Sequence, residues 1–553
     1  MSKYGDLVAP THTPPPVATP IPGRETDMVV NNAGAYTFSV SHEQRILRFL
    51  VLGAEGATYY ADGKDHFRQA YTGTLEAVLA LGTRAVEVVV DVSVNGRAPK
   101  QDATVFALAL CAAKGDAPTR AAAIEAIPRV CRIPTHLFSF LSDYKALGGK
   151  TGGRAMKRAL GRWYIDKDPN SVAHAMVKYR QRGGWTHADV LRLAKPASGD
   201  TPHGHLFSWA VGKGLPVAAL STRYADTIRA FENAQDPNTS PDDLVAIVSG
   251  FDLPREAIPD TRLTASVWKA LLYIGDGMPM TAMIRNLNRM TSAGVLEPSL
   301  KEARFVQSRL RNRAALRRAR VHPLALLSAA RTYANGRGER GSLTWAPNSG
   351  IVAALEDAFL LAFDSVTPTG LRYYVGLDVS GSMMSGEIAG IPGLSPREAS
   401  AALALLWSRT EPTCIVKGFT SASSNHWNRD TSLSDLTDRF ATNGLIELTE
   451  HIGRMDFGAT EPALVIEDAL KNNIMIDVFV ILTDNEVNVG QHPKTVLDEY
   501  RRKMNPNAKM VVIGMTATGF SLADPNDSKM LDVVGFDTAI PTVIANFAAE
   551  GTK

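Results

Sequence analysis

The stretch RYYVGLDVSGSMMSG, residues 372–386, runs from aromatic and aliphatic residues straight into Asp378, Ser380 and Ser382. A short apolar run that stops at an aspartate is typical of a buried strand that delivers a polar loop at its carboxyl end. Open α/β sheets bind their ligands at that edge. Three hard oxygen donors favour a hard divalent cation such as Mg²⁺. Taken alone, the motif fits an ordinary strand-to-turn junction equally well.

The residues around this stretch alternate between strand and helix patterns. Strands are expected at 372–378, 413–419, 475–483 and 508–514, and helices at 395–409, 460–471, 493–503 and 540–549. The alternation predicts an α/β domain with a doubly wound parallel sheet, which we assign to residues 366–553.

Two further loops of this domain carry oxygen donors. The strand VFVILT ends at Asp484, and the loop GATE presents Thr460 at a helix start. Because the carboxyl ends of parallel strands share one edge of the sheet, the five side chains can converge there. They would form an octahedral oxygen cage with one open position, made of Asp378, Ser380, Ser382, Thr460 and Asp484.

The preceding region, residues 36–365, is patterned as short helices almost without strands. Segments such as HEQRILRFLVLG (42–53) and PLALLSAARTYANG (323–336) repeat apolar residues three and four apart between Pro, Thr or Gly. The rhythm suggests stacked α-helix pairs of the HEAT kind, without an exact sequence period. Residues 1–35 are rich in proline, and we expect a flexible arm there.

Composition is that of a globular protein. The 553 residues, 45% hydrophobic and 21% charged, suffice for two or more cores. No run of 18 apolar residues occurs and the proline-rich start does not resemble a signal peptide, so we expect a cytoplasmic protein without a membrane partner. Cys111, Cys131 and Cys414 lack the spacing of a disulfide framework or a zinc site. The net charge of +3 means that a nucleic-acid surface must be a local concentration of basic residues.

Three such basic clusters occur, two of them near aromatic residues. Guanidinium groups bind phosphate bidentately, and aromatic rings stack on unpaired bases. A solvated helix face is the alternative for any one cluster. The candidate RNA-binding residues are Arg154, Lys157 and Arg158 within 148–167, beside Trp163 and Tyr164; Lys178, Arg180 and Arg182 within 177–187; and Arg309, Arg313 and Arg317 within 301–320.

The oxygen cage resembles the metal-ion-dependent adhesion site of von Willebrand factor A domains, in which water or a partner's acidic group completes the coordination. The blocks RILRFLVLGAEGATYY (45–60), GRAMKRALGRWY (153–164), KYRQRGGWTHADVLRLAKP (178–196) and VHPLALLSAARTY (321–333) resemble consecutive blocks of the Ro autoantigen, or TROVE-domain, family. The likeness spans nearly the whole chain after the N-terminal arm.

This resemblance implies a monomeric ring of HEAT-like repeats closed by the von Willebrand A domain. It implies small noncoding Y RNA on the outer surface and single-stranded 3′ ends of misfolded or structured RNA in a basic central hole. Bacterial relatives also tether a ring-shaped 3′-to-5′ exoribonuclease through their Y RNA. Lys178 and Arg182 match family residues that contact Y RNA, and four residues apart they would share one helix face. The segment bearing Arg309, Arg313 and Arg317 would line the hole.

Two positions depart from the family pattern. The threonine loop reads Gly458-Ala459-Thr460-Glu461 where the family motif is G-G-T-D, and some von Willebrand A domains have lost their ion. A family histidine in a segment like R-L-S-H-L-K-P is absent, since the chain reads RLAKP at 192–196. His187 is therefore expected to cap or pack locally.

Catalytic motifs are absent from the sequence. It has no H-E-x-x-H, Walker A or G-x-S-x-G motif, and no carboxylate cluster of the two-metal nuclease type. His203 and His205 lack a third ligand, which favours a polar loop over a metal site. We therefore expect a noncatalytic RNA-binding protein, with a magnesium-dependent protein-binding adaptor or a ribonuclease with a dispersed site as alternatives.

Overall fold

The computed structural model describes residues 19–52, 63–275, 277–338, 342–363, 368–385, 387–388, 394–420, 433–455 and 458–549, with backbone alone at 63–70. The chain divides into two compact units. The first, the sheet unit, comprises the described parts of 1–73 and 363–553; the second, the helical unit, comprises those of 74–362. Within the described ranges, no helix combines the length and apolar character needed to cross a bilayer.

The sheet unit contains a six-stranded sheet in the order β11-β9-β8-β5-β6-β7. Its neighbours pair in parallel except β7, which is antiparallel to β6. Every residue of β8 and β9 is buried, as expected for a parallel sheet covered on both faces. The predicted doubly wound sheet is therefore confirmed. The strands are β5 (Arg372–Asp378), β6 (Thr413–Phe419), β7 (Leu433–Asp435), β8 (Val478–Thr483), β9 (Lys509–Gly514) and β11 (Met530–Val534).

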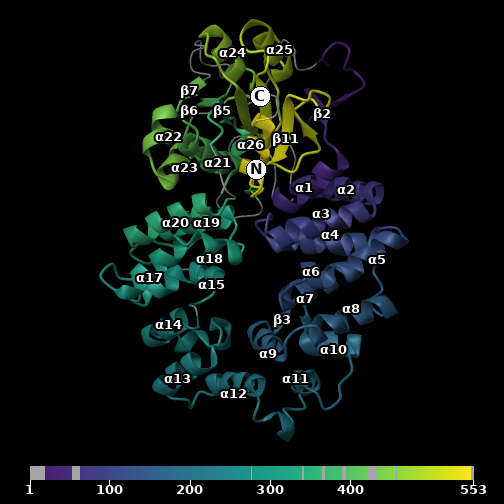
Figure 1. Cartoon of the computed structure of the whole chain (residues 1–553), viewed down its shortest axis with the longest axis vertical. Helices are drawn as coiled ribbons and strands as arrows, with labels where there is room; N and C mark the ends of the chain where they lie inside the picture. The colour runs from purple at the N-terminus through teal and green to yellow at the C-terminus, as the bar shows by residue number, and fades with distance from the viewer. Residues whose placement is uncertain are drawn as a thin grey trace. The chain divides into compact units, whose positions relative to one another are not determined.

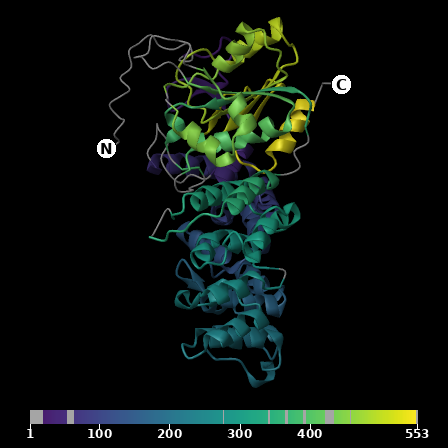
Figure 2. The ribbon, with the colours of Figure 1, turned by 90° about the vertical axis from the view of Figure 1, so that its left-hand side faces the viewer.

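Helices cover both faces of this sheet (Figures 1 and 2). On one face, α24 and α25 pack their apolar side chains against β5, β8 and β9 in the core of the unit. On the other face, α21 contacts β5 and β6 and is itself covered by α22 and α23. The helices are α21 (Pro396–Thr410), α22 (Thr437–Thr442), α23 (Leu445–Gly453), α24 (Leu464–Lys471), α25 (Pro493–Lys503) and α26 (Ile540–Ala549), the last beside β11.

The N-terminal segment 19–52 belongs to the sheet unit. Strand β1 (Met28–Val30) pairs with β2 (Tyr36–Ser39), which pairs with β10 (Phe520–Ser521). Helix α1 (His42–Leu52) packs on β11, and its buried Arg48 donates to the carbonyls of Thr518 and Phe520 at 2.7 Å each. The sequence assigned residues 19–35 to the arm and 36–52 to the helical region, because a local pattern does not reveal a partner some 480 residues away. Residues 1–18 lie outside the described ranges.

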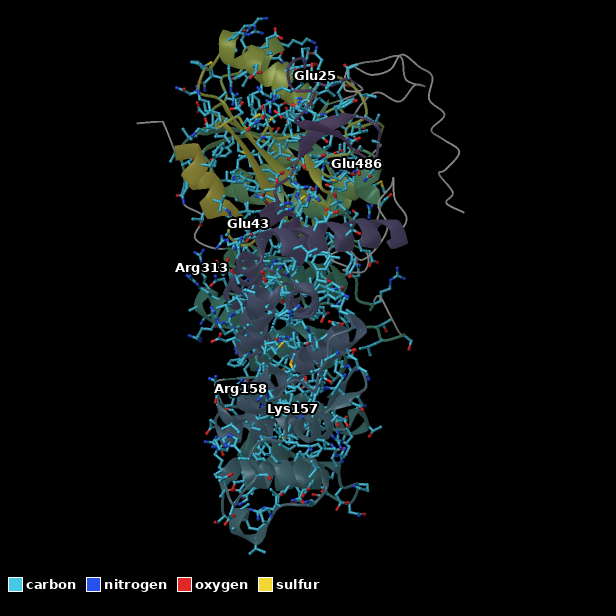
Figure 3. All side chains as sticks on the ribbon, turned by 90° about the vertical axis from the view of Figure 1, so that its right-hand side faces the viewer. Glu25, Glu43, Lys157, Arg158, Arg313 and Glu486 are labelled. Carbon is cyan, nitrogen blue, oxygen red and sulfur yellow. The ribbon has the colours of Figure 1, made fainter. Side chains whose placement is uncertain are left out.

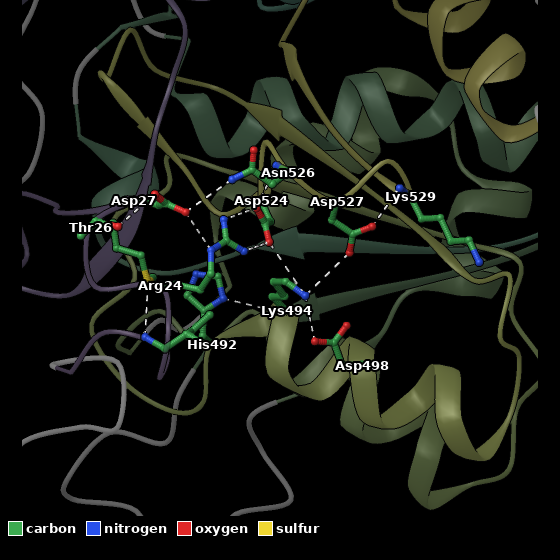
Figure 4. A network of polar contacts seen from close by, with 12 residues as sticks. Arg24, Thr26, Asp27, His492, Lys494, Asp498, Asp524, Asn526, Asp527 and Lys529 are labelled. Atoms are coloured by element: carbon green, nitrogen blue, oxygen red, sulfur yellow. Dashed lines mark hydrogen bonds and ion pairs between the residues drawn. The ribbon is translucent and has the colours of Figure 1, made fainter.

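A network of ion pairs fixes the start of this segment (Figure 4). Arg24 donates to Asp524 through both terminal nitrogens, with Nη2 2.6 Å from Oδ1, and its Nε donates to Asp27. Lys494 lies beside the same cluster, 2.8 Å from Asp498. The Asp524 side chain is only 1% exposed, and Arg24 is its nearer cation, since Lys494 Nζ lies 3.9 Å from the carboxylate.

The helical unit follows the expected rhythm of short helices. Capping residues define their starts: Asp116, Asp168, Thr201 and Ser240 each accept a hydrogen bond from a backbone N–H three residues on, with proline at the next position or the one after. Helix α2 (Gly63–Leu81) spans the boundary between the units. The others are α3 (Thr83–Asn95), α4 (Gln101–Lys114), α5 (Ala117–Glu125), α6 (Ile127–Val130), α7 (Pro134–Ala146), α8 (Arg154–Ile165), α9 (Pro169–Lys178), α10 (His187–Ala194), α11 (Pro202–Ala210), α12 (Arg223–Gln235), α13 (Pro241–Phe251), α14 (Ala265–Leu272), α15 (Met280–Arg285), α16 (Leu287–Ser292), α17 (Lys301–Leu310), α18 (Arg313–Arg318), α19 (Pro323–Ala334) and α20 (Ser349–Leu361).

Segments from early and late in the helical unit contact each other. His322, the N-cap of α19, donates from Nε2 to the carbonyl of Arg97 at 3.1 Å. Gly96, in the left-handed region at φ 71°, lies against Arg320, and a Cβ at position 96 would be 3.0 Å from the Arg320 Cβ. The start of α19 therefore lies against the segment that follows α3.

Candidate metal centre and nucleic-acid interface

The sheet brings the predicted metal ligands to one edge. Leu377 of β5 pairs with Leu482 of β8, so the strands end side by side. The Ser380 N–H donates to Asp378 Oδ1 at 3.0 Å, and the Ser380 and Ser382 hydroxyls are 3.0 Å apart. Ser382 also hydrogen bonds to the Asp484 carboxylate. All four side chains are buried.

The loop before α24 brings Thr460 to the same edge. The Gly381 N–H donates to the carbonyl of Gly458 at 3.4 Å, which joins the serine loop to the threonine loop. The Thr460 N–H donates to Asn488 Oδ1 at 2.9 Å, which joins the threonine loop to the segment after β8. The loops that carry the five predicted ligands are therefore linked by hydrogen bonds.

Burial makes the charged state of these carboxylates costly. It raises the pKa of Asp378, although the Ser380 and Thr483 hydroxyls and the charge of Arg397 oppose the rise. Burial also raises the pKa of Asp484 well above its ordinary value, and the negative charges of Asp378 and Glu486 add to the effect. Two buried carboxylates with few countercharges are what a bound cation stabilises.

The donor set fits a magnesium ion. The Thr460 hydroxyl is buried and has no hydrogen-bond partner within the described residues, so it is an oxygen donor with unused capacity. With two carboxylates and two serine hydroxyls it forms a set of hard oxygen ligands. Across the described ranges, no group of three or more His, Cys, Asp or Glu side chains is arranged to hold a metal.

The N-terminal segment supports the loop that follows Asp484. Asn31 Nδ2 donates to the carbonyl of Val487 at 2.9 Å, and Asn32 Nδ2 donates to Glu486 Oε1 at 2.7 Å. The Ala33 N–H donates to the other oxygen of Glu486 at 3.2 Å. Burial raises the pKa of Glu486 to about 7. Sequence reasoning missed these residues because it placed them in the arm.

The two histidines of TPHGHL lie in helix α11, not in the predicted loop. Thr201 caps that helix and Pro202 begins it. His203 Nε2 donates to the carbonyl of Lys167 at 2.8 Å, and His205 lies 2.7 Å from the Tyr224 hydroxyl. Their ring nitrogens therefore serve helix packing.

The first basic cluster lies on α8 (Figure 3). Arg154 and Arg158 are exposed and Lys157 is half-buried, and none of the three makes an ion pair within the described residues. By contrast, Arg162 pairs with Asp166 at 3.2 Å. The expected aromatic neighbours are not available for stacking, because Trp163 and Tyr164 lie on the buried face of the helix.

The second basic cluster is not helical throughout. Helix α9 ends at Lys178, and Arg182 lies in β3 (Gln181–Arg182), which pairs with β4 (Trp185–Thr186). Gly183 and Gly184, at φ 56° and 77°, form the two-residue hairpin turn that left-handed residues favour. The expectation that Lys178 and Arg182 share a helix face is therefore wrong.

The cations of this cluster remain available for phosphate. Arg180 lies over the ring of Phe231 at 5.3 Å, and Lys178 lies near the ring of Tyr179 at 5.2 Å. Neither they nor Arg182 pair with a carboxylate in the described parts of the chain. His187 packs locally, as expected: it is buried and lies 3.0 Å from both the Tyr164 hydroxyl and the Tyr179 carbonyl.

The third basic cluster forms two helices, α17 and α18, rather than one. Asn312 caps the second of them by accepting from the Ala315 N–H. Arg309 donates to the carbonyl of Met278 at 2.6 Å, so it already stabilises a neighbouring loop. Arg313 and Arg317 are exposed on α18.

Comparisons with known proteins match both units. The model of the TROVE domain matches residues 29–232 and 253–332, and that of the Ro60 vWA domain matches 372–548. A Deinococcus radiodurans protein named RNA-binding protein RO60 is 39% identical over 525 residues, which cover 94% of this chain and 95% of its own. A Caenorhabditis elegans protein of the same name is 33% identical over 600 residues, covering 94% and 90%. The crystal structure of the D. radiodurans RO (RSR) protein aligns with a TM-score of 0.66 at 38% identity, over 92% of this chain and 99% of that one.

Proposed function

This chain belongs to the Ro60 family of TROVE-domain proteins, and on that basis we propose that it is a noncatalytic RNA-binding protein. The single observation that carries the proposal is a set of basic side chains on the helical unit that have no carboxylate partner within the described residues. An unpaired guanidinium or ammonium group is free to bind phosphate, the dominant source of RNA affinity. The set consists of Arg154, Lys157, Arg158, Lys178, Arg180, Arg182 and Arg317.

The RNA in this proposal is of two kinds. Y RNA binds the outer surface through the clusters on α8 and around the β3–β4 hairpin. Single-stranded 3′ ends of misfolded or structured RNA bind in a central opening of the helical unit, lined by Arg313 and Arg317. The contact between His322 and Arg97 supports such an opening, since it brings the start of α19 back to the segment after α3. Arg309 can bind RNA in the opening only if its guanidinium gives up the hydrogen bond to the Met278 carbonyl.

We further propose the biological setting. The protein acts as a cytoplasmic monomer in RNA quality control, maturation or decay. Through its Y RNA it presents substrates to a ring-shaped 3′-to-5′ exoribonuclease. The relatives named RNA-binding proteins support the RNA partner.

Gel shifts with two RNAs at one salt concentration test the RNA-binding proposal. Lys178→Ala with Arg182→Ala should weaken a Y RNA more than a 3′-tailed RNA hairpin, because both residues belong to the cluster that is proposed to bind Y RNA. Arg313→Glu with Arg317→Glu should weaken the tailed hairpin more. Equal losses for both RNAs would contradict the assignment of two surfaces. Divalent-dependent cleavage of either RNA by the purified chain, abolished by Asp378→Ala, would contradict a noncatalytic role.

The sheet unit is proposed to hold Mg²⁺. Asp378, Asp484, Ser380, Ser382 and Thr460 would provide oxygen ligands, and the unused Thr460 hydroxyl supports this assignment. When bound, the ion would offer an open position to an oxygen donor. The residues of this chain would hold the ion and exclude bulk water from it, since all five are buried.

The same buried oxygen donors support a second candidate function, a magnesium-dependent adaptor that would capture an acidic group of a partner protein. The test is binding of a glutamate-bearing peptide with Mg²⁺ and with EDTA. The adaptor function requires capture in Mg²⁺, loss in EDTA and loss in Thr460→Val. Capture that survives EDTA would place the peptide elsewhere on the chain.

A further inference from the structure

A surface cavity of about 530 Å³ lies beside the second basic cluster, within the helical unit. Three consecutive elements surround it. Arg180 and Gln181 come from the segment after α9, Thr186 and His187 from the start of α10, and Trp209 and Ala210 from the end of α11. Its volume falls within the range of cavities that bind small molecules.

The aromatic wall of this cavity is held in place before any ligand arrives. The Trp209 indole N–H donates to Glu232 Oε1 at 2.9 Å, and its ring meets the edge of Phe231 at a centroid distance of 6.4 Å. Both partners lie on α12. Trp209 is half-buried, so part of its ring remains open. A fixed and partly exposed indole can stack on a planar ligand with little loss of side-chain entropy.

The rim of the cavity is cationic. Arg180 lies over the ring of Phe231, and Trp209 contacts the same ring, so one aromatic side chain positions both the guanidinium and the indole. No residue that lines the cavity is acidic. Gln181 is exposed and its amide makes no hydrogen bond within the described residues. The cavity therefore combines a stacking surface, an amide that donates and accepts, and a positive charge.

We propose that this cavity receives one unpaired nucleobase of a bound RNA, stacked on Trp209, with the Gln181 amide at its polar edge and Arg180 at the adjoining phosphate. The inference rests on the proposed RNA-binding function and specifies what the surface reads. Because every base has a planar face, stacking would favour an unpaired nucleotide over a paired one with little preference among bases. A duplex alone offers no base to the cavity, so the site distinguishes RNAs by local structure.

A peptide side chain is a weaker candidate for this cavity. An aromatic side chain would use Trp209 but would leave Arg180 and Gln181 without partners. A nucleotide supplies a planar ring for Trp209, polar base edges for Gln181 and an anionic phosphate for Arg180. The nearby cations Lys178 and Arg182 extend the same positive surface.

The test uses the full chain and two RNA hairpins that differ only by a single bulged 2-aminopurine. The native chain should bind the bulged hairpin about 10-fold or more tightly than the unbulged one, as expected for one stacked base. It should also quench the 2-aminopurine fluorescence. Trp209→Ala should reduce the affinity for the bulged hairpin to that for the unbulged hairpin. The affinity for the unbulged hairpin should change little. Trp209→Phe should recover part of the difference.

The control is Tyr273→Ala, which removes another exposed aromatic ring of the helical unit, 40% exposed and far along the chain. It should preserve the difference between the hairpins. If Trp209→Ala keeps the difference while its melting temperature is native-like, the cavity is not a base site. If Trp209→Ala unfolds, Gln181→Ala with Arg180→Gln must remove the difference, or the proposal fails. If neither hairpin binds the native chain in dilute salt, the proposed function itself fails.

Discussion

The Thr460 hydroxyl lies buried without a hydrogen-bond partner within the described residues, in a loop bonded to those that carry Asp378 and Asp484. Thr460→Val removes this oxygen and keeps the shape of the side chain. We expect the metal-free stability to stay within about 1 kcal/mol of native, because no hydrogen bond is lost. The rise in melting temperature on adding Mg²⁺ should disappear. Thermal unfolding in Mg²⁺ and in EDTA measures both effects.

The matched control is Thr483→Val at the end of β8. The Thr483 hydroxyl donates to Asp378 Oδ2 at 2.6 Å and accepts from the Asn485 N–H at 3.1 Å. Its loss should lower stability in EDTA by roughly 1–3 kcal/mol, since it leaves a buried carboxylate oxygen unpaired. A Thr460→Val variant that keeps the full magnesium response would remove Thr460 from the ligand set.

His187 should make the helical unit sensitive to acid. Burial lowers the pKa of His187 from 6.5 to about 4. Between these two pH values the histidine is protonated in the unfolded chain and neutral in the folded chain. The free energy of unfolding is therefore unaffected by this group above pH 6.5 and decreases as the pH falls toward 4. At pH 5 the loss is roughly 2 kcal/mol. His187→Gln, which keeps a donor and an acceptor, should lessen the decline in urea unfolding free energy between pH 7.5 and pH 5. An unchanged decline would assign it to other groups.

The convergence of the five predicted ligands could be predicted from the sequence because it follows from a general rule: parallel strands end at one edge, and these residues follow those strands. The role of Arg309 could not. Its charge suggested phosphate, but its guanidinium packs over Gly277 and donates to Met278. Those contacts depend on the placement of another helix and are invisible in a local pattern.

At the scale of elements, capped helices and fully buried strands were predictable, and short strands were not. The segment from 178 to 186 contains the Gly183-Gly184 turn signal, but its basic residues were interpreted at helical spacing. Strand β7 has three residues and β10 has two, so neither shows a period. Their existence depends on pairing with β6 and β2.

The N-terminal segment should contribute measurably to the stability of the sheet unit. Arg24→Ala would leave the buried Asp524 carboxylate with the Asn526 N–H at 2.9 Å and with Lys494 Nζ, a cation 3.9 Å away. We expect a loss of about 3 kcal/mol, at the lower end of the cost of breaking a buried pair, because Lys494 compensates in part. Urea unfolding of the full chain provides the measurement.

Lys503→Ala is the control for that prediction. Lys503 pairs with Glu499 on α25 of the same unit, but the two side chains are 64% and 40% exposed. Its removal should cost about 0–1 kcal/mol. Equal losses for the two variants would mean that Arg24 acts as a surface charge and does not fix the segment.

At the scale of the whole molecule, opposite charges nearly cancel. The chain carries 59 Lys and Arg against 56 Asp and Glu, so its overall field attracts RNA weakly. Affinity must then come from local cations that lack acidic neighbours. The number of such contacts can be counted, because each phosphate neutralised releases bound counterions.

The salt dependence of RNA binding therefore tests which cations are in contact. Lys157→Ala with Arg158→Ala should reduce the slope of log affinity against log salt by about 1.4–1.8, since each lost phosphate contact contributes about 0.7–0.9. Arg162→Ala, on the same helix but paired with Asp166, should leave the slope unchanged. Filter binding of one Y RNA at several salt concentrations measures all three proteins. Equal slopes would exclude α8 from the interface, whereas a smaller slope for Arg162→Ala would show that an ion pair does not prevent an arginine from binding phosphate.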